Sequence, residues 1–130
     1  MYIEWGDKDM GSNICEHGKL SPEWYWKKGL HDAHVVGTSS QVFQYDPVLR
    51  ASNYVEIKLD ASQAMFDTTI KTIKLYNCKV LTPGFDIEGM WWVRDELYTS
   101  GEKYVLKIEL RSLKVHYNYV LRFDYCEVER

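Results

Sequence analysis

The sequence predicts a mainly β protein, an antiparallel β sandwich or open half-barrel with one short N-terminal helix. Three observations lead to this prediction. Apolar or aromatic side chains recur at every second position between Glu102 and Arg130, where the chain has no glycine or proline. Tyr, Trp and Phe make up 15% of the chain, and such side chains suit pleated surfaces. Several short strand-like segments alternate with turn residues, and the crossover helices that a parallel sheet requires are missing from the pattern.

Composition limits the class of protein. The 130 residues are about one domain, so we predict a single domain over 1–130, with a loop-rich arm at 1–20. A net charge of -3 disfavours nucleic acid as a partner. No apolar run is long enough for a membrane helix, so no membrane partner is expected. The three cysteines are far apart and lack a CxxC pair, which favours reduced thiols and a cytoplasmic location.

The first expected element is a helix of about two turns over 21–28. Ser21 can cap the free amides, Pro22 suits the first helical position, and Gly29 marks the end. The segment 30–36 then leads into a strand. A turn is expected at 37–40, followed by a short strand that ends before Pro47.

The middle of the chain predicts two further strands. Residues 54–60 form the clearest one, because apolar and polar side chains alternate there. Residues 68–82 are rich in β-branched side chains, but the apolar parity changes between Leu75 and Val80. A β-bulge near 77–78 would reconcile the two parities.

The segment 85–99, which follows a Pro-Gly turn, fits both a helical stripe and a strand. Its Trp-Trp-Val core favours the strand. Because adjacent strand residues point to opposite faces, we expect one of Trp91 and Trp92 to lie outside the main core. The closing meander has its hairpin turn near Ser112 or near Asn118, and the pattern does not decide between them.

His31, Asp32 and His34 are the candidate metal ligands, because neutral imidazole and carboxylate groups both bind zinc. On a strand, His31 and His34 point to opposite faces, so they converge only in a helical or bulged segment. The alternative is structural: His31 or Asp32 supports a corner of the fold, and His34 lies on a solvated face.

Trp24, Trp26, Trp92 and His31 are the candidate contact residues, because the aromatic side chains exceed what one sheet face needs. Core filling is the alternative role for the tryptophans. We predict a non-enzymatic domain without a cofactor that binds a protein partner or self-associates as a homodimer. The alternative is a small metal-assisted enzyme that uses His31, Asp32 and His34, although no GxSxG, phosphate-loop or HExxH motif is present.

Three segments carry a resemblance to known proteins: 30–36 with its His-Asp-Ala element, Trp-Trp-Val-Arg-Asp-Glu-Leu-Tyr at 91–98, and the closing strand 120–129. Together they resemble small bacterial β-rich proteins of unassigned function. Some comparably small acidic β proteins are similar to toxin-neutralising immunity proteins. The resemblance implies a compact bacterial cytosolic domain and transfers no catalytic residue.

Overall fold

The computed structural model describes residues 22, 24–26, 29–62, 64, 69–82, 84 and 86–130. In this part of the chain all regular structure is β, and no helix is present. The strands are β1 (His34–Asp46), β2 (Ala51–Asp60), β3 (Thr72–Tyr76), β4 (Lys79–Val80), β5 (Trp91–Ser100), β6 (Lys103–Arg111), β7 (His116–Phe123) and β8 (Tyr125–Glu129). Accordingly, the described residues contain no helix that is long and apolar enough to cross a membrane.

The helix expected over 21–28 is not seen in the described residues. Pro22 and 24–26 form turns there: the Tyr25 amide donates to the Pro22 carbonyl at 3.1 Å, and the Gly29 amide donates to the Trp26 carbonyl at 3.0 Å. The other residues of that expected helix, and the arm at 1–20, lie outside the described residues.

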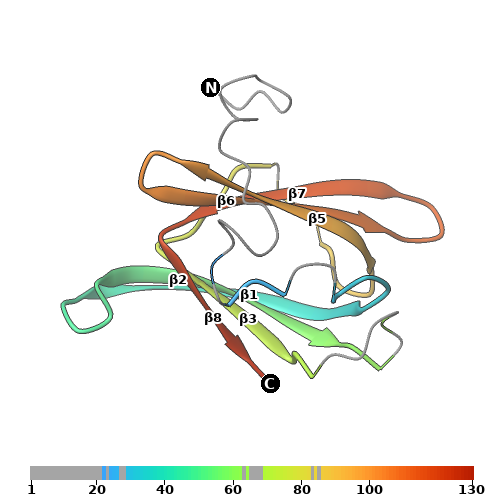
Figure 1. The fold of residues 1–130 in the computed structure, drawn as a ribbon, viewed down its shortest axis with the longest axis horizontal. Helices are drawn as coiled ribbons and strands as arrows, with labels where there is room; N and C mark the ends of the chain where they lie inside the picture. The colour runs from blue at the N-terminus through green and yellow to red at the C-terminus, as the bar shows by residue number, and fades with distance from the viewer. Residues whose placement is uncertain are drawn as a thin grey trace.

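The strands form one antiparallel sheet of eight strands in the order β4-β7-β6-β5-β1-β2-β3-β8, which confirms the expected all-β antiparallel class. β1 and β5 share a single register pair in the described part, His34 with Trp91, so the sheet divides there into two halves. We call β1, β2, β3 and β8 the β1 half, and β4 to β7 the β5 half. The two halves lie over one another in Figure 1, and among the described strands β4 and β8 are left as the ends of a sheet that does not close.

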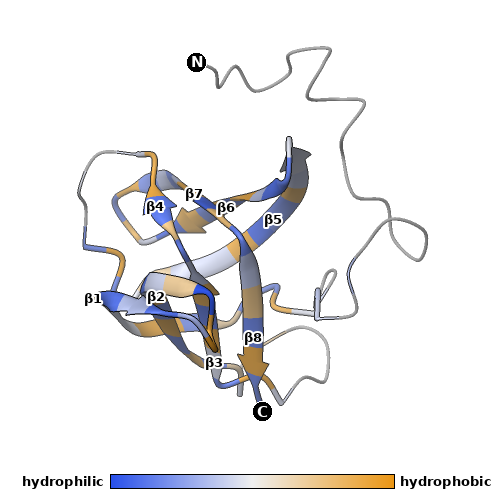
Figure 2. Ribbon diagram, turned by 90° about the vertical axis from the view of Figure 1, so that its left-hand side faces the viewer, coloured by the Kyte–Doolittle hydropathy of each residue, from blue (hydrophilic) through white to orange (hydrophobic). Residues whose placement is uncertain are grey.

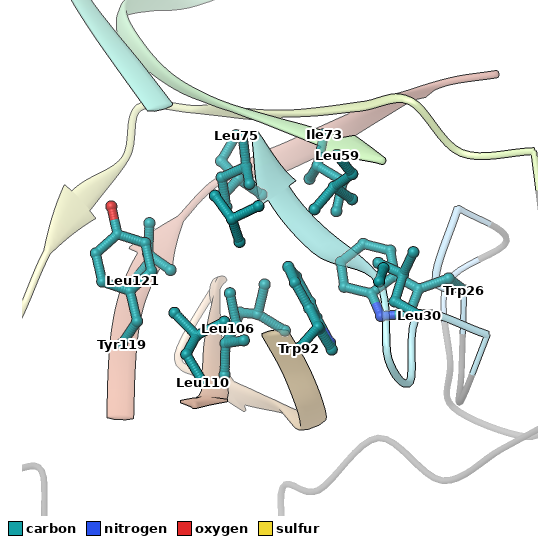
Figure 3. Close-up of a cluster of buried hydrophobic side chains, with 14 of the residues drawn as sticks. Trp26, Leu30, Leu59, Ile73, Leu75, Trp92, Leu106, Leu110, Tyr119 and Leu121 are labelled. Atoms are coloured by element: carbon teal, nitrogen blue, oxygen red, sulfur yellow. The ribbon is translucent and has the colours of Figure 1, made fainter. Parts of the chain in front are cut away.

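The hydrophobic core fills the space between the two halves. Hydrophobic and hydrophilic residues alternate along the strands (Figure 2), so each half turns one apolar face inward. Figure 3 shows Leu59, Ile73 and Leu75 of the β1 half opposite Leu106, Leu110 and Trp92 of the β5 half. Trp91 is 36% exposed and Trp92 is fully buried, which confirms that one of this pair lies outside the core.

The chain crosses between the halves at two corners, after β3 and after β7. Asn77 has a positive φ of 52°, and its amide group donates to Asp124 Oδ2 at 2.7 Å and to the Arg50 carbonyl at 2.9 Å. Asp124 also accepts a bond from Lys103. The change of parity near 77 therefore marks a strand end and a corner, where we expected a bulge inside one strand.

The turn expected at 37–40 is wrong, because β1 runs through it without a break. Thr38 pairs with Ile57 and Ser40 with Val55, and the two register shifts lie on either side, between Val35 and Gly37 and between Val42 and Asp46. The polar residues that indicated a turn instead extend a strand, because β2 supplies the hydrogen-bond partners. The last hairpin turn lies at Ser112, where the Ser112 amide donates to the Val115 carbonyl at 2.8 Å.

Candidate functional site

A cavity of about 380 Å³ lies beside the turn that precedes β1. This volume is within the range of small-molecule sites, roughly 300–1,000 Å³. We call it the His31 groove. It is lined by His31, Asp32, Trp91, Val93, Arg111, Ser112 and Leu113. The lining comes from three places in the sequence: the turn before β1, the first residues of β5, and the end of β6 with the turn that follows it.

The imidazole of His31 is held in one orientation. Its Nδ1 makes a short contact with the carbonyl oxygen of Val93, and because a carbonyl can only accept, Nδ1 carries the proton. In the tautomer that carries its proton on Nδ1, Nε2 is an acceptor, and it lies 3.7 Å from Oδ2 of Asp32. Asp32 has a positive φ of 71°, which is unusual for a residue with a side chain. Two acceptor atoms at this distance can share a proton or a cation.

His34 is not brought into this pair. Its ring lies 5.3 Å from the ring of Trp91, and its register partner on β2 is Asp60. The structure therefore brings His31 and Asp32 together and places His34 against Trp91. No group of three or more His, Cys, Asp or Glu side chains among the described residues is arranged to hold a metal ion.

The candidate contact tryptophans are mostly internal. Trp92 is fully buried and Trp26 is 7% exposed, while Trp24 is half-buried beside Tyr104 and Phe123. Figure 3 shows Trp26 and Trp92 together in the core. The contact surface proposed below is therefore built from other side chains.

Asp95 anchors this aromatic cluster, and sequence reasoning missed it. Its Oδ2 accepts bonds from the indole nitrogens of Trp26 at 2.7 Å and Trp92 at 2.8 Å, and its Oδ1 accepts one from the hydroxyl of Tyr25. The carboxylate thus fixes the segment before β1 to the β5 half. A signal existed, because Asp95 has the same strand parity as the buried Leu97.

A second candidate surface is the outer edge of β1 over Thr38–Tyr45, which we call the β1 edge. Residues 38–42 pair with β2 on one side, and 43–45 lie in the register shift that follows Val42. In the described part of the chain no strand lies on the other side, because β5 leaves β1 after His34. Every side chain here is exposed except Phe43, which is half-buried. Val42 is 84% and Tyr45 57% exposed, and the segment contains no charged residue.

A row of aromatic rings supports the β1 edge from within its own half-sheet. The rings of Phe43 and Tyr54 have centroids 6.1 Å apart, those of Tyr54 and Tyr76 5.8 Å, and those of Tyr76 and Tyr125 4.5 Å. The hydroxyl of Tyr54 also donates to Gln41 Oε1 at 2.8 Å. Such cross-strand pairs stabilise a sheet, so the β1 edge is presented in an extended conformation.

The two end strands of the described sheet, β8 and β4, differ from the β1 edge. β8 carries Glu127 and Glu129, and β4 is only two residues long. Charged and very short edge strands are the usual protections against pairing with another chain. The β1 edge has neither protection.

No protein-family model, curated protein or solved structure matches this chain. The geometry of the two surfaces is therefore the starting point for a function.

Proposed function

We propose that this chain is a non-enzymatic protein-interaction domain that binds an extended segment of a partner as an added strand on the β1 edge. The observation that carries the proposal is the exposed, uncharged β1 edge, which pairs only with β2 among the described strands. Backbone amide and carbonyl groups along such an edge can hydrogen-bond a new strand, and this gives most of the affinity in strand addition.

Side chains of the β1 edge define the chemistry of the partner. Val42 and Phe43 are neighbours on the strand, so their side chains point to opposite faces, and Tyr45 is exposed within the register shift that follows Val42. A segment with apolar side chains on both faces and few charges fits this arrangement, because apolar side chains of the partner would cover Val42 and Tyr45. A bacterial toxin is one such partner, as the resemblance to immunity proteins implies.

The test is selection of extended peptides from a random library on the immobilised chain, followed by amide exchange. A selected peptide should slow exchange of the amides of 38–45. Val42→Lys should weaken peptide binding about tenfold or more, because a charge on an edge strand disfavours pairing. Leu113→Lys is the matched control, since Leu113 is 91% exposed on the turn between β6 and β7. Peptides that bind Val42→Lys as well as the unmodified chain would refute the proposal.

A second candidate function is chemistry in the His31 groove, favoured by the fixed imidazole of His31 beside Asp32. A ligating histidine commonly donates the N–H of its other ring nitrogen to a backbone carbonyl, as Nδ1 of His31 does to the carbonyl of Val93. Nε2 of His31 and the carboxylate of Asp32 would together supply two ligands to a divalent cation or act as a proton acceptor. A small metal-assisted enzyme would use this pair.

Zinc titration calorimetry separates the two roles of the pair. If the pair holds a cation, His31→Ala should abolish zinc binding while His34→Ala leaves it unchanged, because His31 lies within 4 Å of Asp32 and His34 packs against Trp91 instead. Absence of zinc binding by the unmodified chain would reject the metal-assisted candidate.

A further inference from the structure

We infer that the His31 groove binds a small zwitterion, a free α-amino acid with an apolar side chain. The inference goes beyond strand addition and does not depend on it, because no residue of the β1 edge lines the groove. Three features of the lining support it: a pair of acceptor atoms, an arginine without an acidic partner, and an apolar wall. One ligand with an ammonium group, a carboxylate and an apolar body satisfies all three.

The acceptor pair consists of Nε2 of His31 and Oδ2 of Asp32, which lie 3.7 Å apart. In the neutral ring with its proton on Nδ1, neither atom carries a hydrogen for the other. One ammonium nitrogen at about 2.9 Å from each atom can bridge them and donate to both. An organic cation suits this pair better than a metal ion, because the described residues contain no group of three or more metal-ligating side chains.

Arg111 supplies the positive charge of the groove. It is the register partner of Trp91, so the two side chains share the outer face of the β5 half. Glu109, two residues earlier on the same face, is already bonded to Arg94 at 2.7 Å and lies 4.0 Å from His116. Arg111 itself forms no ion pair with any carboxylate in the described part of the chain. Its planar fork of donors matches a carboxylate, which the ligand would supply.

The apolar wall is formed by Trp91, Val93 and Leu113. The ring of Trp91 is 36% exposed and packs against the ring of His34 at 5.3 Å between centroids. Val93 lies in the register shift of β5, and bulges of this kind aim side chains beside binding sites. An indole face and two aliphatic side chains favour a ligand whose body is apolar.

The two charges of the groove come from different elements. Asp32 belongs to the turn before β1 and Arg111 to the end of β6, and no ion pair joins these two described residues. A ligand with a single charge would leave one of them uncompensated. A zwitterion compensates both, and a cavity of about 380 Å³ holds one small molecule. The lining therefore favours a free amino acid over a sugar, a fatty acid or an inorganic anion.

The test is titration of the ¹⁵N-labelled chain with three small molecules, followed by nuclear magnetic resonance. L-phenylalanine should shift the indole N–H signal of Trp91. 3-Phenylpropionate, which lacks the ammonium group, and 2-phenylethylamine, which lacks the carboxylate, should each bind at least about tenfold more weakly. Equal affinities for the three molecules would overturn the inference. So would the absence of any shift when L-phenylalanine is added close to its solubility limit.

Two substitutions assign the charges. Arg111→Gln should weaken binding of L-phenylalanine and 3-phenylpropionate about tenfold and leave 2-phenylethylamine unchanged. Asp32→Asn should weaken the two amines and leave 3-phenylpropionate unchanged, and asparagine tolerates the positive φ of 71° at this position. Arg94→Gln is the matched control, since Arg94 is bonded to Glu109 and does not line the groove. An equal loss in this control would overturn the assignment of Arg111.

Zinc separates this inference from the metal-assisted candidate. A groove that binds zinc through His31 and Asp32 but shows no shift with L-phenylalanine supports that candidate and overturns the inference. Failure of strand addition is also distinguishable, because protection of the 38–45 amides by a selected peptide reports on a surface outside the groove. Either proposal can therefore fail while the other stands.

Discussion

Replacement of Asp95 by alanine should be among the most destabilising changes on the inner side of β5. The carboxylate accepts bonds from Tyr25, Trp26 and Trp92, and all three donor residues are at most 7% exposed. Removing it leaves two indole N–H groups and one hydroxyl in a buried site without these partners. It also detaches the segment before β1 from the β5 half.

The size of the effect follows from the number of donors. A hydrogen bond to a charged group contributes about 1.5–3 kcal/mol, and three bonds at the lower end of this range give about 4.5 kcal/mol for Asp95→Ala. Asp95→Asn keeps one oxygen as an acceptor but presents an NH₂ group to at least one donor. We therefore expect a loss of about 2 kcal/mol for Asp95→Asn.

Urea unfolding followed by tryptophan fluorescence measures these losses, with an unchanged m-value as the check that unfolding remains two-state. Glu96→Ala is the matched control: Glu96 is the next residue on β5, is exposed, and accepts a bond from the Tyr98 hydroxyl at 2.6 Å. It should cost less than about 1 kcal/mol. A loss below about 1 kcal/mol for Asp95→Ala would refute the anchoring role.

Three further predictions concern the corners and the buried thiols. In urea unfolding, Asn77→Ala should have a free energy of unfolding about 1 kcal/mol below that of Asn77→Gly. Both variants lose the side-chain hydrogen bonds of Asn77, but only alanine is strained at a φ of 52°. Equal unfolding midpoints would contradict this prediction. Burial opposes ionisation of Asp124, but bonds from Lys103 and Asn77 lower the pKa of Asp124 below its ordinary value. The stabilisation by Asp124 is therefore present above about pH 4 and lost as the pH falls through the folded-state pKa. The difference in unfolding free energy between the unmodified chain and Asp124→Asn should accordingly shrink in acid. A difference that stays constant with pH would count against the bonds from Lys103 and Asn77. Burial raises the pKa of Cys78 to about 12, and burial also raises the pKa of Cys126. Both thiols should therefore react with an aromatic disulfide reagent at pH 8 far more slowly in the native chain than in urea, with sites assigned by mass spectrometry; equal rates would contradict the burial.

The alternation of apolar and polar side chains at every second position predicted the strands that pair with neighbours in the sequence. The alternation over 54–60 became β2, and the closing alternation became β6 and β7, with inward residues such as Leu106 and Leu121 fully buried. Trp91 is partly exposed and Trp92 is fully buried, as expected for adjacent residues of a strand. In each case the side-chain parity alone carries the information.

Features that depend on distant partners were not predictable in the same way. Residues 37–40 have the composition of a turn, and only pairing with β2 makes them a strand. Asp95 finds its donors Tyr25 and Trp26 about seventy residues away in the sequence. The strand parity that Asp95 shares with Leu97 indicates an inward side chain, but no local pattern identifies these donors. The same limit applies to His31, whose position depends on the carbonyl of Val93.

The crossing at Asp124 also has a consequence for biosynthesis. β3 pairs with β8, so the edge of β3 that carries Ile73 and Leu75 stays uncovered until their register partners Val128 and Cys126 have been translated. During that interval the nascent β1 half exposes an apolar strand. We therefore expect completion of the fold to follow translation of β8, and ribosome-bound chains stalled before Asp124 to recruit chaperones.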